Sequence, residues 1–153
     1  MRILTVRNPW AQAIVWAGKD VENRTRNVAG GYRGPVAIHA AARVNPIGEW
    51  YEFTKTHPRA AATLRNAPSG PETFGAVIGV VDLVDVHWSG MECSRGPKRC
   101  HEYGLCSPWA EAYTHHLVLA NPRPLAEPIP YRGALGLRTL DDEMVARIEA
   151  AIA

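Results

Sequence analysis

The run FGAVIGVVDLVDV, residues 74–86, constrains the fold more than any other part of the sequence. Its first half is apolar on both faces, which is typical of a strand buried on both sides of a sheet. Polar residues appear only in its second half, at Asp82 and Asp85. Because β-branched residues dominate the run, it favours a strand over a helix. The sequence therefore predicts a sheet with this strand in its interior.

Shorter elements flank this run. Asn8 and Pro9 are typical of a helix start, with Asn8 as the N-cap, and a glycine follows the helix after residue 17. Five or six short strands with few long helices indicate an α+β fold with a small mixed or barrel-like sheet. We expect strands at residues 2–6, 36–41, 116–119 and 134–137, extended runs at 22–24 and 121–130 (the latter a proline-rich edge), and helices at 9–17, 45–65 with a break at Pro58, 109–113 and about 139–152.

The length of 153 residues fits one domain, spanning residues 1–153. Hydrophobic residues make up 46% and charged residues 21%, so the chain is globular rather than disordered. No apolar run approaches the roughly 20 residues of a membrane helix, and the N-terminal segment lacks the apolar core of a signal peptide. These features predict a cytoplasmic protein with no membrane partner.

The net charge is only +2, which excludes a generally polycationic protein, but the charges are unevenly placed. Basic residues are enriched at 19–33 and 91–101, and acidic residues gather after residue 140. The stretch GKDVENRTRN, residues 18–27, brings five charged side chains directly after an apolar helix. It could be a plain surface loop, or it could be the floor of a pocket for a polar ligand.

The chemistry of this stretch suits a nucleotide. Lys19 and Arg24 are cations that could bind a phosphate or polarise a carbonyl. Glu22 could hold both cations, act as a base or accept a hydrogen bond from an exocyclic amine. Trp10 and Trp109 could stack on a base. Further basic residues could follow a phosphate backbone: Arg26, Arg33, Lys98 and Arg99.

Each of these residues also has a purely structural interpretation. Lys19 and Glu22 could form an ordinary surface ion pair, and Trp10 lies on the apolar face of its helix, where core packing is expected. His39 alternates with apolar neighbours, which favours a core histidine with a satisfied hydrogen bond. Tyr32 and Arg33 could simply close a turn.

Three cysteines raise the question of a metal. Cys93, Cys100 and Cys106 lie near His87 and His101 in the sequence. Three thiolates with one imidazole, that of His101, would complete a tetrahedral zinc site. The tight CxxC spacing of zinc modules is missing, however, and a cytoplasmic chain keeps its thiols reduced. The pattern therefore favours reduced thiols and no cofactor, with structural zinc as the alternative.

Five blocks together resemble a known family: TVRNPWAQAIVWAGKDVENRT, YRGPVAIHAA, GAVIGVVDLVDV, SPWA and NPRPLAEPIPYRGALGL. They are similar to the ASCH domain of the PUA-like superfamily, over about residues 1–137. The most specific element is the NPW helix followed by GKxxExR, which is Gly18, Lys19, Glu22 and Arg24 here. The resemblance implies a PUA-like small β-barrel with flanking helices, and a cleft beside the first helix that contains Lys19, Glu22 and Arg24.

The resemblance also implies an RNA-related function. ASCH and related domains are mostly associated with RNA, and some with modified nucleobases. Some small members hydrolyse N4-acetylcytidine with a Lys, a Thr and a Glu, and others are reported as ribonucleases. Lys19 matches the catalytic Lys, but Glu22 stands at the Thr position. Glu111 and Glu102 are both open as the remote Glu.

We therefore expect a module that binds RNA or a modified nucleotide in the cleft. The alternatives are an enzyme on RNA or modified nucleosides, with Lys19 and Glu22 as catalytic residues, and a protein-interaction adaptor whose cleft has lost its ligand. The expected ligand-binding residues are Asn8, Trp10, Lys19, Glu22, Asn23, Arg24, Arg26, Tyr32, Arg33, His39 and Trp109.

Overall fold

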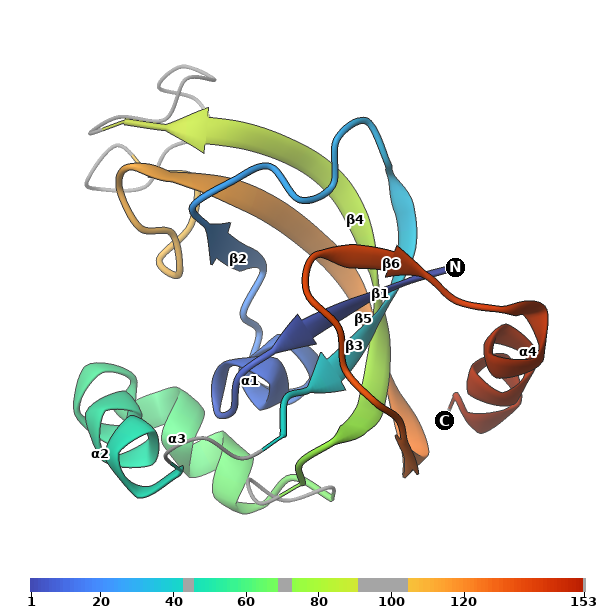
Figure 1. Ribbon diagram of the computed structural model, residues 1–153. Helices are drawn as coiled ribbons and strands as arrows, with labels where there is room; N and C mark the ends of the chain where they lie inside the picture. Colours follow the sequence, from blue (N-terminus) through green and yellow to red (C-terminus); the bar gives the residue numbers. More distant parts are fainter. Residues whose placement is uncertain (43–45, 69–72, 91–104, 153) are drawn as a thin grey trace.

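A computed structural model describes residues 1–42, 46–68, 73–90 and 105–152. Six strands form one curved sheet in the order β2-β5-β4-β3-β1-β6 (Figure 1). The strands are β1 (Arg2–Val6), β2 (Val21–Arg24), β3 (Gly34–Ala40), β4 (Ala76–Ser89), β5 (Thr114–Pro130) and β6 (Leu137–Thr139). The described helices are α1 (Trp10–Trp16), α2 (Pro46–Thr56), α3 (Pro58–Arg65) and α4 (Asp142–Ala151).

The apolar run lies inside this sheet, as the sequence predicts. It forms most of β4, which pairs antiparallel with β3 on one edge and with β5 on the other. The first six residues of β4 are all buried, because helices cover the sheet on both faces. Where the strand turns polar, Asp82 forms an ion pair with Arg123 of β5 at 2.6 Å.

The sheet does not close into a barrel, so that part of the predicted fold is wrong, while the mixed α+β class is confirmed. No ladder joins β2 to β1 or β6 in the described part of the chain. The free edge of β1 pairs with β6, and the four residues of β2 pair only with β5. A side chain spans the opening instead: Arg24 Nη2 donates to the main-chain oxygen of Thr5 at 2.7 Å. We call this opening the β1–β2 gap.

Helices cover both faces of the sheet. Because successive strand residues point to opposite faces, Leu4 packs in the cluster that contains Ile14 of α1, and Ile3 packs in the cluster that contains Ile148 of α4. The approach of α1 to the sheet is close. A Cβ on Gly79 would meet the Val15 methyl groups at 2.9 Å, so only glycine fits at this point of β4.

The proline-rich half of β5 behaves as the predicted edge run. It continues the 116–119 strand without interruption, and its ladder with β2 ends at Val118. The prolines that follow therefore have a ladder with β4 on one side only. The predicted break at Pro58 is also confirmed, since it separates α2 from α3.

Three local expectations are wrong. The last short strand, expected at residues 134–137, is found as β6 at Leu137–Thr139. Asn8 does not cap α1: Pro9 occupies the N-cap position, and Asn8 Nδ2 donates to the main-chain oxygen of Thr73 at 2.6 Å. Residues 109–113 form turns rather than a helix. Side chains take the backbone donors that a helix would need, because Trp109 N donates to Ser107 Oγ and Glu111 N donates to Asn23 Oδ1.

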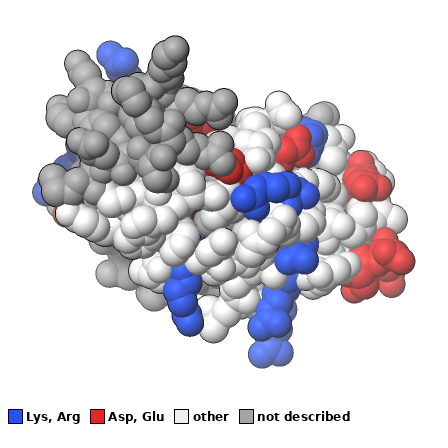
Figure 2. Space-filling view, turned by 90° about the horizontal axis from the view of Figure 1, so that it is seen from above, with Lys and Arg blue, Asp and Glu red and all other residues white. Residues whose placement is uncertain are grey.

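The acidic C-terminal segment folds as predicted into a helix, α4. Its N-cap, Asp141, accepts a hydrogen bond from Met144 N at 2.7 Å, and Met144 and Ile148 bury its apolar side. Figure 2 shows acidic side chains gathered at the right of the view, where α4 lies, and Lys and Arg side chains interspersed with uncharged surface elsewhere. Among the described helices, none has the length and apolar character needed to cross a membrane.

Candidate functional site

A cleft of about 260 Å³ lies at the β1–β2 gap. Residues on both sides of the gap line it, together with residues of α1 and of the segment before β5. They are Thr5, Val6, Arg7, Trp10, Lys19, Glu22, Asn23, Arg24 and Glu111. The open side of the sheet therefore coincides with the charged stretch that follows α1.

Lys19 is held in the wall of this cleft. Gly18, with a φ of 70°, reverses the chain after α1, and Lys19 N donates to Ala13 O of the last helical turn. The side chain is only 3% exposed. Its ammonium donates to Glu22 Oε2 at 2.9 Å and to the main-chain oxygen of Val21. A buried ammonium with these acceptors is fixed in position rather than mobile on the surface.

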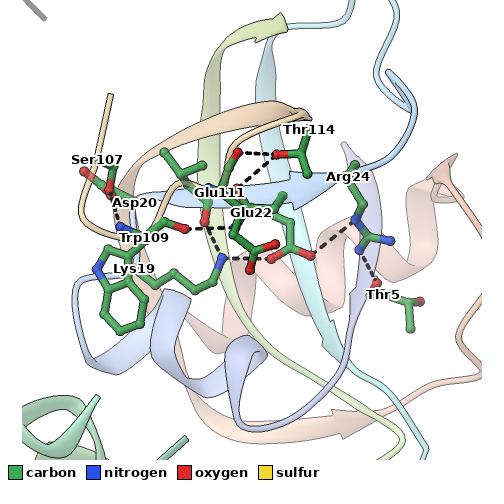
Figure 3. Close-up of polar contacts among 11 residues, drawn as sticks. Thr5, Lys19, Asp20, Glu22, Arg24, Ser107, Trp109, Glu111 and Thr114 are labelled. Carbon is green, nitrogen blue, oxygen red and sulfur yellow. Dashed lines mark hydrogen bonds and ion pairs between the residues drawn. The ribbon is translucent and has the colours of Figure 1, made fainter. Parts of the chain in front are cut away.

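Glu22 lies between two cations. One carboxylate oxygen contacts Lys19, and the other lies 3.2 Å from Arg24 Nε. Arg24 in turn donates to the main-chain oxygen of Thr5 (Figure 3). The three side chains form a chain of contacts across the gap with a net charge of +1. A guanidinium has five N–H groups, so Arg24 can bind a ligand oxygen while it holds Glu22 and Thr5.

Asn23 points away from this chain of contacts and ties a distant segment to β2. Its Nδ2 donates to Trp109 O at 2.8 Å, and its Oδ1 accepts from Glu111 N at 3.0 Å. Ser107 adds a hydrogen bond to Asp20. These bonds place the segment 107–111 against the cleft, and they hold Glu111 by its main chain, so that its side chain is exposed at the cleft wall.

An aromatic cluster adjoins the cleft. Trp10 meets Phe53, His57 and Trp109 edge to face, with ring centroids 4.9, 5.2 and 6.5 Å apart. His57 stacks on Trp109 with a centroid distance of 4.6 Å and an interplanar angle of 2°. Trp10 and Trp109 are half-buried, so each packs in the cluster and keeps part of its surface exposed.

His57 has an unusual electrostatic environment. Burial lowers its pKa below the ordinary 6.5, the positive charge of Lys19 lowers it further, and Glu111 opposes both. The ring is therefore neutral at neutral pH. Lys19 and Glu111 line the cleft, and the His57 ring packs edge to face on Trp10, which lines it too.

The structure brings together the predicted residues Trp10, Lys19, Glu22, Asn23 and Arg24, and places Trp109 beside them. Sequence reasoning missed Thr5, Val6, Arg7 and His57 as site residues. The first three belong to the TVRN run that opens the strongest block of the resemblance. His57, which packs on Trp10 of the cleft lining, gave no local signal, because that contact depends on the packing of α3 against α1.

Other predicted residues lie elsewhere. Tyr32 donates its hydroxyl to Pro35 O at 2.8 Å, and Arg33 contacts Asp85 at 3.9 Å and the carbonyls of its own turn. His39 is 1% exposed, and its Nε2 donates to Tyr131 O at 2.9 Å. This is the core histidine that its apolar neighbours favour, and none of these three lines the cleft.

The remaining predictions are distributed as follows. Asn8 is buried and bonded to Thr73 O, and Arg26 is exposed outside the cleft lining. Of the two candidates for a remote carboxylate, Glu111 lines the cleft, and Glu102 lies outside the described residues. Lys98 and Arg99, with Cys93, Cys100 and His101 of the alternative zinc set, also lie outside them.

Comparisons with known proteins agree with this fold. A scan against protein-family models matches none, and a search of curated proteins finds no significant match. Among solved structures, the chain is similar to the ASCH protein of Zymomonas mobilis. One substituted form has 16% identity and a TM-score of 0.58, with coverage of 99% of this chain and 98% of that chain.

Two further structures of the same Zymomonas mobilis protein match comparably. A second substituted form has 15% identity and a TM-score of 0.54, and the unsubstituted protein has 15% identity and a TM-score of 0.52. Both matches cover 99% of this chain, with 96% and 95% of the other chain. The matches confirm the likeness to ASCH-domain structures, although the closed barrel that the resemblance implied is not present: this chain has the fold of the ASCH-domain proteins.

Proposed function

We propose that this ASCH-fold protein binds a single-stranded RNA segment or a nucleotide, including a modified one, in the cleft at the β1–β2 gap. One observation carries the proposal: the Lys19–Glu22–Arg24 chain of contacts, with Lys19 and Glu22 buried, crosses the open side of the sheet next to two half-buried tryptophans. Cations fixed in position beside aromatic rings are what a phosphate and a base together require.

The roles follow from the contacts. Arg24 donates to a phosphate or carbonyl oxygen, and Lys19 adds positive charge from the cleft wall. Glu22 fixes both cations, which lowers the entropy lost when a ligand binds. Trp10 or Trp109 offers a stacking surface, worth about 1–3 kcal/mol per base. Binding then weakens as salt rises, because a cationic site releases counterions from the ligand.

A second candidate is an enzyme on RNA or a modified nucleoside. It is favoured by Lys19 and Glu111, which both line the cleft, and by His57, whose pKa their charges shift in opposite directions. In an amide hydrolysis, Lys19 would stabilise the oxyanion and Glu111 would transfer the proton. In RNA cleavage, Lys19 and Arg24 would stabilise the phosphorane. Glu22 at the position of the family's Thr counts against the first reaction.

The test compares wild type with Lys19→Ala and Arg24→Gln on single-stranded RNA and, separately, on N4-acetylcytidine. RNA retention is measured at two salt concentrations, and products are followed by mass-resolved chromatography. Lys55→Ala is the matched control, because Lys55 also pairs with a Glu three positions away but is exposed. Circular dichroism establishes that each variant is folded.

Salt-sensitive retention that falls in both cleft variants and persists in Lys55→Ala is the expected result. Product that disappears in Glu111→Gln would instead favour the enzyme, since that change leaves the main-chain bonds of Glu111 intact. Retention equal in wild type and both folded cleft variants would refute the cleft as the binding site.

A further inference from the structure

Three potential metal ligands lie close together at β4 and β5, outside the cleft lining. His87 on β4 and His116 on β5 are direct partners in the antiparallel ladder, so their side chains share one face of the sheet. Cys106, from the segment before β5, joins them. One ligand atom from each residue lies within 4.8 Å of the others.

The distances suit a metal ion. His116 Nδ1 lies 3.3 Å from His87 Nε2 and 3.1 Å from Cys106 Sγ. Zinc binds nitrogen at about 2.0 Å and sulfur at about 2.3 Å; tetrahedral angles then separate two nitrogens by about 3.3 Å and a sulfur and a nitrogen by about 3.5 Å. These two distances are therefore close to those of a tetrahedral centre, and the third, from His87 Nε2 to Cys106 Sγ, is at most 4.8 Å.

Each of the two histidine rings makes a hydrogen bond on the side away from the cluster. These bonds indicate which nitrogen carries a hydrogen and which one faces the cluster. His116 Nε2 lies 2.8 Å from Glu111 O, and a carbonyl can only accept, so Nε2 carries the hydrogen. His87 Nδ1 lies 2.9 Å from Asp85 Oδ2, and a carboxylate likewise accepts. His87 Nε2 and His116 Nδ1 then face one another across 3.3 Å, and each can offer a lone pair to a metal ion held between them.

The same outer contacts are those that metal-binding histidines use. A ligating His typically donates its other N–H to a carboxylate or a backbone carbonyl, which fixes the ring and raises its basicity. His87 has the first kind of partner and His116 the second. His116 is fully buried, and Cys106 and the His87 side chain are largely shielded from solvent.

The geometry points to a zinc site formed by His87 Nε2, Cys106 Sγ as a thiolate, and His116 Nδ1. One imidazole pair and one thiolate match the ligand preference of Zn²⁺. Three protein ligands leave a fourth position for a further ligand such as water. Of the residues considered for zinc from the sequence, Cys106 and the nearby His87 take part here, whereas His116 was not considered.

This site stabilises the segment that carries the cleft residues. The ring of His116 holds Glu111 O, and Cys106 is adjacent to Ser107, which bonds to Asp20. A metal that fixes Cys106 and His116 therefore anchors both ends of the segment 106–111. Its role is structural, and it is independent of whether the cleft binds RNA.

The first test measures metal content in the full chain, purified without a histidine tag and under reducing conditions. We expect about one zinc ion per chain in wild type, and loss of zinc in Cys106→Ser and His116→Ala. His115→Ala is the matched control and should retain zinc, because His115 precedes His116 on β5 and its ring packs on Trp88 instead.

A second measurement covers the case in which a ligand variant fails to fold. X-ray absorption of the zinc-loaded wild type should show at least one sulfur and two imidazole nitrogens around the metal. Cobalt substitution should give a thiolate-to-metal charge-transfer band. Wild type that neither contains nor takes up zinc, or zinc surrounded by oxygen ligands alone, would overturn the assignment, as would undiminished zinc in both folded ligand variants.

Discussion

Asn23 Nδ2 donates a hydrogen bond of 2.8 Å to the main-chain oxygen of Trp109, across 86 positions of sequence. The same side chain accepts from Glu111 N at 3.0 Å. One side-chain amide therefore satisfies two backbone groups, Trp109 O and Glu111 N, in a segment that forms neither a helix nor a strand. The position of Trp109 and Glu111 at the cleft depends on a residue of β2 that sequence reasoning had assigned to the ligand.

Replacement of Asn23 by alanine should lower the free energy of unfolding by about 1–3 kcal/mol, because Glu111 N loses its acceptor. Urea denaturation followed by tryptophan fluorescence measures this change. Asn66→Ala is the control: Asn66 is exposed and donates only within its own helix end, so its change should stay within about 0.5 kcal/mol. Equal effects of the two substitutions would contradict the anchoring role.

The Lys19–Glu22 pair should be strongly coupled. Lys19→Met should lower stability toward the lower end of about 3–5 kcal/mol, because Arg24 still neutralises Glu22. A double-mutant cycle with Glu22→Gln measures the coupling. The exposed pair Lys55–Glu52, at 3.8 Å, has the same sequence separation and should give at most about 1 kcal/mol. Similar coupling energies in both cycles would show that burial does not strengthen the interaction between Lys19 and Glu22.

The pKa of His57 should respond to its two charged neighbours with opposite signs. Lys19→Met should raise it, because the positive charge of Lys19 holds it down, and Glu111→Gln should lower it further. NMR titration of the His57 ring resonances in the folded protein measures both shifts. Shifts of the same sign in the two variants would mean that neither side chain acts on the ring through its charge.

Asp82 should contribute to the acid sensitivity of the fold. Hydrogen bonds from Arg123 and then Asn121 lower its pKa below the ordinary 3.8. A carboxyl with a lowered folded pKa stabilises the protein above its unfolded pKa, and that contribution is lost as the pH falls through the folded value. Asp82→Asn should therefore flatten the fall in stability at acid pH, measured by denaturation across the pH range.

Glu127→Gln serves as the control for that series. Glu127 is an exposed carboxylate on β5, so its replacement should leave the acid limb of the stability curve unchanged. If the stability of Asp82→Asn still falls steeply at acid pH, the acid sensitivity of the fold comes from other groups.

Much of the fold could be predicted because the signals are local. The run that forms β4 is apolar over enough residues to require burial. A proline interrupts a helical run at its own position, as Pro58 does between α2 and α3. Lys19, Glu22 and Arg24 could be assigned to one site because they lie within one reversal of the chain after α1.

What could not be predicted depends on register and topology. Whether the sheet closes is decided by which strand takes the free edge of β1, and no local pattern near Arg2 encodes its pairing with Thr139. His87 and His116 face each other only because β4 and β5 pair in one register, and the spacing of the cysteines does not encode that register. Tyr32 and Arg33 follow the charged stretch closely, yet the chain turns them away from the cleft.

The Arg24 side chain spans the β1–β2 gap, where no backbone ladder joins the two strands. In a closed barrel, the distance between neighbouring strands is set by backbone hydrogen bonds that every residue shares. Here one side-chain hydrogen bond, from Arg24 Nη2 to Thr5 O, spans the opening instead. We therefore expect substitution of Arg24 to change the width of the cleft while every strand keeps its register.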